Sequence, residues 1–259
     1  MSKMSKKIVI ANWKMNPVSF KEAEKLFKNI NKTFFGLKKT EVVICSPCVY
    51  LAKLKNLAKK IKLGGENIFY EESGAYTGEI SAEMLYDTGA KYVILGHSER
   101  RTIFGETNED VNKKIKAGLS VGLTPIVCIG EKERSENNEY LNFVKEQIEL
   151  GFKNILKTSI GKIIVAYEPV WAIGKNAVRE ATAEEFLEIS IFIKKVLSDK
   201  FGAQEASKVK IIYGGSVNPK NIEAFIKVGQ ADGFLVGRAS LDPIKFGEII
   251  NLTENISEK

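Results

Sequence analysis

The chain has 259 residues, of which 44% are hydrophobic and 27% are charged, and its formal net charge is +7. This composition is ordinary for a soluble globular protein. No stretch approaches the roughly 20 apolar residues of a membrane span, and the apolar run that follows Lys6 and Lys7 is too short for a signal peptide. We therefore expect a cytoplasmic protein with no membrane partner.

The distribution of the positive charge and the number of cysteines argue against two further classes, nucleic-acid-binding proteins and disulfide-stabilised proteins. The lysines are spread along helical segments and mixed with glutamates, which is typical of solvated helix faces, so we expect no nucleic-acid partner. A general positive field still favours capture of a small anionic substrate. The three cysteines are an odd number and do not make a disulfide framework.

Short apolar runs alternate with helical patterns along the whole chain. The predicted strands are Ile8–Ala11, Glu41–Cys45, Ile61–Glu66, Tyr92–Gly96, Pro125–Ile129, Ile163–Tyr167, Val209–Tyr213 and Gly233–Val236. The predicted helices are Phe20–Ile30, a segment through Leu51 to Ala58, Glu109–Ala117, Glu139–Ile155, Ala183–Phe201, Asn221–Val228 and Pro243–Ile250, with a long loop over Asn67–Ser81.

Eight such strand–helix units predict an α/β fold, a closed (β/α)₈ barrel, as a single domain over residues 1–259. A doubly wound open sheet is the alternative. It is disfavoured because no G-x-G-x-x-G sequence follows the first strand.

Catalytic residues of such barrels lie at the C-terminal ends of the strands. There the sequence places Asn12 and Lys14 after the first strand, His97 after the fourth and Glu168 after the sixth. His97 is the only histidine, and a helix that starts at Ser98 would disfavour its protonated form, so a neutral ring can donate a hydrogen bond.

Glycine-rich turns follow the seventh and eighth predicted strands, at Gly214-Gly215-Ser216 and at Gly237. Such turns expose backbone N–H groups and are the usual phosphate anchor of these barrels. A single histidine without acidic partners at metal spacing predicts no metal site, and we expect no cofactor. One carboxylate base, a neutral histidine, a lysine and a phosphate anchor suit proton abstraction next to a carbonyl in a small phosphorylated molecule.

Five sequence blocks resemble the triosephosphate isomerase family, and the resemblance runs from Ile8 to about Ile250. The blocks are Asn12-Trp13-Lys14-Met15-Asn16, Gly74-Ala75-Tyr76-Thr77-Gly78-Glu79, Gly96-His97-Ser98-Glu99-Arg100-Arg101, Tyr167-Glu168-Pro169-Val170-Trp171-Ala172-Ile173-Gly174 and Tyr213-Gly214-Gly215-Ser216-Val217. A Glu base with a neutral His electrophile is the known pairing of this family.

The resemblance implies a role for each matching residue. Glu168 would move a proton between the two carbons of dihydroxyacetone phosphate and glyceraldehyde 3-phosphate, and His97 would polarise the carbonyl. Lys14 would balance the negative charge and Asn12 would hold a substrate oxygen. The remaining implied residues are Gly174, Ser216, Gly237 and Arg238 at the phosphate, Ser98, Glu99 and Cys128 behind the reacting groups, and Thr77 and Glu79 in a loop that forms a homodimer.

Three positions depart from the family pattern. Arg238 stands where a second glycine is usual; we predict a negative φ and a guanidinium directed away from the phosphate, over the rim or toward an acidic neighbour. The hinge after Gly174 is longer than usual, running from Lys175 to Ala181, and Tyr76 replaces the common Phe.

Three other functions compete with this interpretation. Another phosphate-binding barrel isomerase or lyase would need acidic catalytic residues at strand ends that are apolar here. A thiol redox protein would use the pair in Cys45-Ser46-Pro47-Cys48. However, Cys45 is the last residue of an apolar strand, whereas the first cysteine of a redox pair lies at a helix N-terminus. A nucleic-acid binder is disfavoured by the spread of the lysines.

Overall fold

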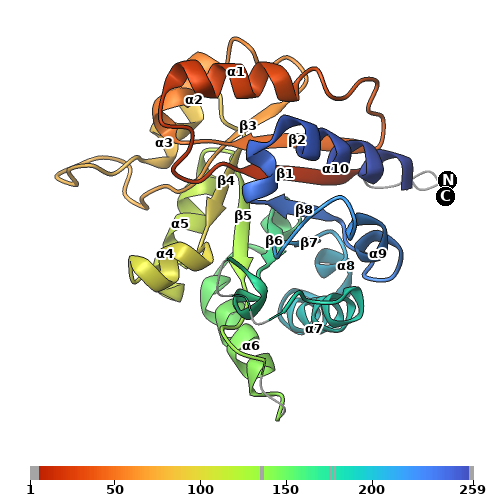
Figure 1. Cartoon of the computed structure of the whole chain (residues 1–259). Helices are drawn as coiled ribbons and strands as arrows, with labels where there is room; N and C mark the ends of the chain where they lie inside the picture. Colours follow the sequence, from red (N-terminus) through yellow and green to blue (C-terminus); the bar gives the residue numbers. More distant parts are fainter. Residues whose placement is uncertain (1–5, 135–136, 175–176, 178, 257–259) are drawn as a thin grey trace.

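Eight parallel strands close into a barrel in the computed structural model, which describes residues 6–134, 137–174, 177 and 179–256 (Figure 1). The strands are β1 Lys7–Asn12, β2 Thr40–Cys45, β3 Lys62–Gly65, β4 Tyr92–Leu95, β5 Thr124–Ile129, β6 Ile164–Tyr167, β7 Lys210–Tyr213 and β8 Gly233–Val236. Each strand pairs with the next, and β1 pairs with β8. The predicted closed (β/α)₈ barrel is confirmed.

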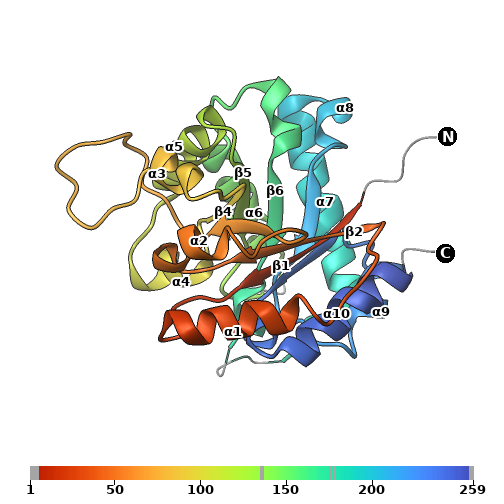
Figure 2. The same ribbon diagram turned by 90° about the horizontal axis from the view of Figure 1, so that it is seen from above.

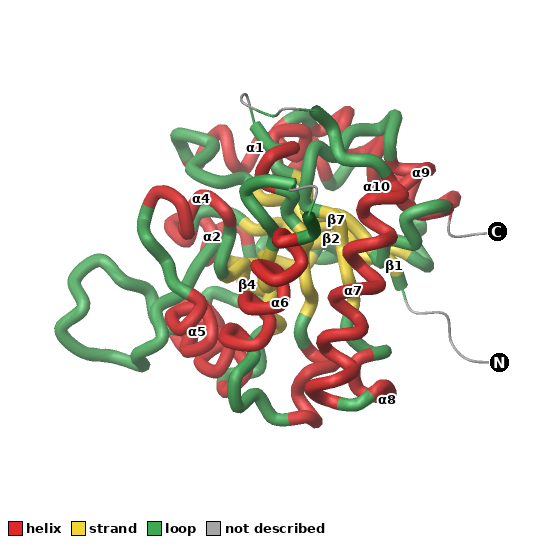
Figure 3. The backbone as a smooth tube through the Cα atoms, turned by 90° about the horizontal axis from the view of Figure 1, so that it is seen from below, coloured by secondary structure: helices red, strands yellow, loops and turns green. Residues whose placement is uncertain are grey.

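Helices surround the strands on the outside of the barrel (Figures 2 and 3). The α-helices are α1 Phe20–Ile30, α2 Cys48–Leu54, α3 Ala82–Asp87, α4 Ser98–Ile103, α5 Asn108–Ser120, α6 Glu139–Gly151, α7 Ala183–Phe201, α8 Ala203–Ala206, α9 Ile222–Lys227 and α10 Pro243–Ile256, and the 3₁₀ helices are η1 Lys157–Lys162, η2 Val170–Ala172 and η3 Arg238–Leu241.

Successive residues of each strand point alternately into the barrel and toward the helices. In β1, Ile8 and Ile10 belong to the inner cluster, whereas Val9 and Ala11 belong to the cluster that packs against the helices. Both faces are therefore buried, which explains why the strands read as continuous apolar runs. Cys45 and Cys128 lie in the inner cluster.

Several helix ends differ from the sequence prediction, and the segment predicted through Leu51 to Ala58 already ends at Leu54. The helix predicted over 139–155 ends at Gly151, and Asn154 adopts a left-handed φ of 58°, so the apolar pattern that continues to Ile155 is not helical. The last helix extends beyond the predicted Ile250 to Ile256. In these places apolar periodicity alone does not mark where the hydrogen-bonded turns stop.

The short helices α3 and α4 have too few turns to give a periodic signal, and each begins at a side-chain cap. The Ser81 side chain accepts a hydrogen bond from the Met84 N–H, and the His97 side chain accepts one from the Glu99 N–H. Helix α4 therefore starts directly after β4, where the sequence had placed a histidine at a strand end.

A long loop between β3 and α3 extends away from the barrel (Figures 1 and 2). Every residue from Glu71 to Glu79 in this loop is exposed. Phe69 stacks on Tyr70 with ring centroids 4.2 Å apart, and it contacts Tyr76 at 4.7 Å. None of the described helices is long and apolar enough to cross a membrane.

Candidate active site

Glu168 follows the last residue of β6 and is 2% exposed. Its backbone N–H still bonds to the carbonyl of Ile129, at 2.8 Å, but Pro169 cannot donate to the ladder and the strand ends. The neighbouring strand makes room for the side chain with a glycine, because a Cβ on Gly214 would lie 3.1 Å from Glu168 Cγ. The carboxylate is thus held inside the C-terminal end of the barrel.

The Glu168 carboxylate is engaged by the start of α4. Its Oε2 accepts a hydrogen bond from the Ser98 N–H at 2.9 Å, and its Oε1 lies 3.1 Å from His97 Nε2. The two groups expected to react with a substrate therefore contact each other. A substrate that binds between these two groups would have to separate them.

The hydrogen bonds of His97 determine its tautomer. Its Nδ1 accepts the N–H of Glu99 at 3.2 Å, which requires an unprotonated Nδ1. A neutral ring must then carry its proton on Nε2, the atom that faces Glu168. The local fold of α4 thus presents an N–H donor at the site, since an imidazolium would lose the bond from Glu99.

Lys14 approaches the same place from β1. It has a left-handed φ of 54°, and its backbone N–H donates to Asn12 Oδ1 at 3.1 Å, which forms a tight turn after the strand. Its ammonium group lies 2.5 Å from Glu99 Oε1. A single residue, Glu99, therefore fixes His97 through its backbone and Lys14 through its side chain.

Cys128 and Arg101 pack behind Glu168. Burial raises the pKa of the Cys128 thiol well above its usual value, and the charge of Glu168 beside it adds to this effect, so the thiol is neutral. Arg101 donates to the backbone carbonyls of Gly96 at 2.7 Å and Cys128 at 3.4 Å. Burial lowers the pKa of Arg101. This arginine ties the ends of β4 and β5 together beneath the carboxylate.

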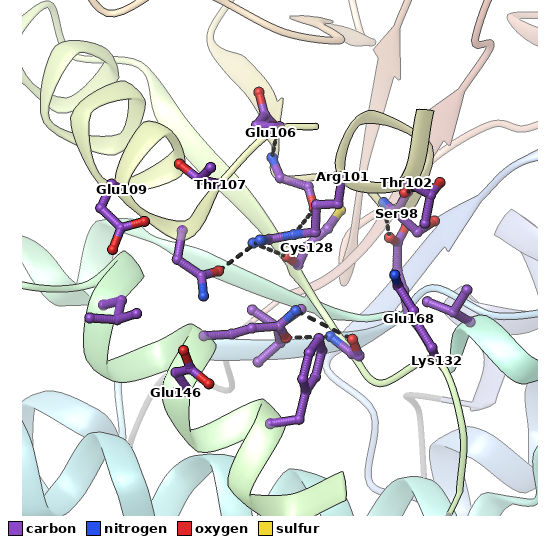
Figure 4. A pocket seen from close by; sticks show the side chains of 18 residues that line it. Ser98, Arg101, Thr102, Glu106, Thr107, Glu109, Cys128, Lys132, Glu146 and Glu168 are labelled. Carbon is purple, nitrogen blue, oxygen red and sulfur yellow. Dashed lines mark hydrogen bonds between the residues drawn. The ribbon is translucent and has the colours of Figure 1, made fainter. Parts of the chain in front are cut away.

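A cavity of about 320 Å³ reaches Glu168 from the side of α5 and α6 (Figure 4). Ser98, Cys128 and Glu168 line its inner end, and Figure 4 shows the hydrogen bond from Ser98 to Glu168 there. His97 and Lys14 do not line it. The cavity therefore lies behind the base and is distinct from the place where His97, Lys14 and the glycine-rich turns converge.

The predicted phosphate-binding residues lie on three loops at the same end of the barrel. Gly174 is exposed with φ 83°, and Ser216 Oγ donates to the carbonyl of Ala172 at 3.1 Å. A Cβ on Gly237 would lie 3.6 Å from Lys14 Cε, so this turn adjoins the lysine.

Arg238 is the first residue of η3. It is not among the residues with positive φ, as predicted, and its side chain is exposed. Within the described residues, however, no ion pair to an acidic neighbour is formed by Arg238. The predicted orientation of its guanidinium away from the phosphate stays a prediction.

Two carboxyl groups near the site, one buried and one partly buried, were not singled out from the sequence. Glu66 follows β3, beside the Lys14 backbone, and its Oε1 is buried without a hydrogen-bond partner. Glu131 Oε1 accepts bonds from the Tyr167 hydroxyl at 2.7 Å and from Trp171 Nε1 at 2.8 Å. Both follow strands, so the rule that located Glu168 could have found them.

The remaining predicted residues do not join this cluster. Thr77 and Glu79 lie in the exposed loop between β3 and α3. Of the longer hinge, Lys175, Asn176 and Val178 lie outside the described residues. In the part of the chain that the structure describes, no group of three or more His, Cys, Asp or Glu side chains could hold a metal ion.

Comparison with known proteins identifies the family. Residues 7–253 match the family model described as triosephosphate isomerase. Triosephosphate isomerases of Dictyoglomus thermophilum and Clostridium botulinum are each 44% identical to the chain, covering 95% and 94% of it and 99% and 98% of the relatives. That of Endomicrobium trichonymphae is 42% identical over 97% of the chain and the whole relative. The chain therefore belongs to the triosephosphate isomerase family and is an isomerase.

Proposed function

We propose that this isomerase interconverts dihydroxyacetone phosphate and glyceraldehyde 3-phosphate with Glu168 as the base. The carboxylate takes a proton from the carbon next to the carbonyl, and the electron pair of the broken C–H bond moves to form an enediolate. Glu168 then returns the proton to the neighbouring carbon. The observation that carries this assignment is the burial of Glu168 beside the Nε2–H of His97, 3.1 Å away.

His97 acts as the neutral electrophile in this proposal. Its Nε2–H donates to the substrate oxygens and passes a proton between them, while Nδ1 stays bonded to the Glu99 N–H. Lys14 supplies the positive charge that balances the phosphate and the enediolate, and Asn12 holds a substrate oxygen. The short contact of Lys14 with Glu99 supports this role, because it keeps the ammonium group in place.

The phosphate is held by backbone N–H groups of the loops that contain Gly174, Ser216 and Gly237. Helix η3 begins directly after Gly237, and the first N–H groups of a helix have no partner within that helix, which favours an anion there. Arg238 contributes its backbone N–H and directs its side chain over the rim. The segment from Pro169 to Gly174 covers the substrate, since an enediolate phosphate exposed to water can eliminate phosphate.

The working unit is a homodimer in which the loop with Thr77 and Glu79 reaches the partner's active site. Large apolar side chains are exposed next to Lys14 in the sequence and on helices α3 and α4, among them Met15 at 92%, Met84 at 55% and Ile103 at 69%. A contiguous patch of such side chains would be typical of a protein interface, and the proposed dimer would cover them. We further propose that the whole chain forms one domain and acts in the cytoplasm.

The experiment that tests the mechanism shortens the base while keeping its charge. Glu168→Asp withdraws the carboxylate by one methylene, and such misplacement costs about 10²-fold or more in turnover. In a coupled assay with glyceraldehyde 3-phosphate we expect kcat to collapse, whereas the affinity for glycerol 3-phosphate changes little. Unchanged turnover would place the base elsewhere.

A further inference from the structure

Arg179 lies against the segment that follows Glu168 and makes two contacts at once. Its guanidinium carbon is 4.6 Å from the centroid of the Trp171 ring, a cation–π arrangement. The two terminal nitrogens donate to the Glu185 carboxylate, Nη1 to Oε2 at 2.9 Å and Nη2 to Oε1 at 2.5 Å. The flat guanidinium thus stacks on the indole with one face while its edge binds a carboxylate.

Glu185 belongs to the first turn of α7 and is itself fixed. Its carboxylate accepts the N–H of Thr182 at 2.8 Å, and its own N–H donates to Thr182 Oγ1 at 3.2 Å, which is a capping box. Helix α7 packs on the barrel through buried side chains along its whole length, beginning with Ala183 and Phe186. Arg179 is therefore anchored to a part of the fold that cannot readily move.

Trp171 is held from a second direction by β5. Its Nε1 donates to Glu131 at 2.8 Å, and Glu131 lies two residues beyond the end of that strand. The indole is thus fixed between Glu131 and Arg179 while Glu168, three residues earlier, is bonded to Ser98. All of these contacts are made in the position of the segment that the structure shows, which we take as its resting position.

We propose that Arg179 is a positioning residue that stabilises the resting position of the segment Pro169–Gly174 and so sets how readily this segment closes on the substrate. The inference rests on the proposed role of that segment as a cover. Because Arg179 is anchored to α7, displacement of Trp171 toward the substrate breaks the stack. An interaction made only in the resting state lowers the population of the closed state and weakens ligand binding.

Replacing Arg179 with Gln tests the proposal, because it removes the stack and the ion pair from an exposed side chain. We expect glycerol 3-phosphate, which has the phosphate but no carbonyl to react, to bind about two- to fivefold more tightly, as an exposed cation–π contact allows. The KM should fall by a similar factor while kcat does not rise. Loss of a positive charge by itself would weaken binding of this anion, so the expected direction is opposite to a simple charge effect.

Three further variants separate the mechanism from its alternatives. Lys195→Gln removes an exposed positive charge from α7 and should leave the affinity unchanged or slightly weaker. Glu185→Gln keeps a side chain suited to the capping box but releases the guanidinium, and it should give an intermediate tightening. Arg179→Lys keeps the charge without the flat fork. Its affinity for glycerol 3-phosphate should therefore lie between that of the wild type and that of Arg179→Gln.

A spectroscopic measurement reports on Trp171 itself. The two tryptophans of the chain are replaced by 5-fluorotryptophan and the fluorine NMR spectrum is recorded. In ligand-free Arg179→Gln, the Trp171 chemical shift should move toward the value that it has in the ligand-bound wild type. Unchanged or weaker ligand binding, or an equal tightening in Lys195→Gln, would overturn the proposal. The affinity measurement does not depend on turnover. A wild type without isomerase activity would therefore refute the proposed function. An active wild type, together with an Arg179→Gln variant whose affinity for glycerol 3-phosphate is unchanged, would refute only this inference.

Discussion

Replacing Glu66 with Gln should stabilise the protein, and the gain should grow with pH. Glu66 is partly buried, and its Oε1 is fully buried without a hydrogen-bond partner. Burial raises its pKa from the ordinary 4.5 to about 9; the charge of Glu99 adds to this, whereas the Lys14 N–H and ammonium oppose it. The folded protein therefore holds a proton on Glu66 at neutral pH that the unfolded chain has released.

The sign and size of the effect follow from this difference in proton binding. A carboxyl whose pKa is raised on folding lowers the free energy of unfolding once the pH exceeds the pKa of the unfolded state. This loss of stability grows with pH until the pH passes the pKa of the folded state. The loss accumulates at about 1.36 kcal/mol per pH unit, so it reaches about 3 kcal/mol at pH 7 and about 6 kcal/mol at pH 9. The amide of Gln is neutral throughout, so it carries no such pH-dependent loss.

The assay is urea unfolding of the wild type and Glu66→Gln at pH 5, 7 and 9, at one protein concentration so that association does not change the comparison. The difference in unfolding free energy should be small at pH 5 and largest at pH 9. Glu248→Gln, at an exposed carboxylate on α10, is the control and should show almost no difference. A Glu66→Gln variant that is no more stable than wild type at pH 7, or a difference independent of pH, would refute the reasoning.

Three other changes give clear expectations. Deleting Glu71–Glu79 should leave a monomer with little activity, measured by analytical ultracentrifugation and the coupled assay; a fully active monomer would contradict the proposed dimer. Cys48→Ser should keep isomerase activity, because Cys45 and Cys48 are free thiols whose pKa values are raised by burial; a reversible oxidative loss that tracks a Cys45–Cys48 disulfide would count against this. Arg238→Gly should change substrate affinity only a few-fold, and a salt-sensitive loss of tenfold or more would show that the guanidinium binds phosphate.

The strands and the end of the barrel that carries the site followed from local sequence. An apolar run such as Ile163–Tyr167 is buried on both faces in any arrangement of a parallel barrel, so the pattern alone indicates the strand. Because parallel strands all end at one edge, Asn12, His97 and Glu168 could be placed together without knowing any contact between them. Glycine at the turns marked the loops in the same way.

Only the tertiary structure decided the pairings and the burial of individual groups. The orphaned oxygen of Glu66, the tautomer of His97 and the stack of Arg179 on Trp171 each depend on atoms that closure of the barrel or packing of a loop brings together. A sequence pattern reports periodicity along one element, whereas the pKa of a carboxyl or the geometry of a guanidinium depends on distances across elements. For that reason the candidate catalytic residues could be identified from the sequence, but the contacts that determine their protonation and position could not.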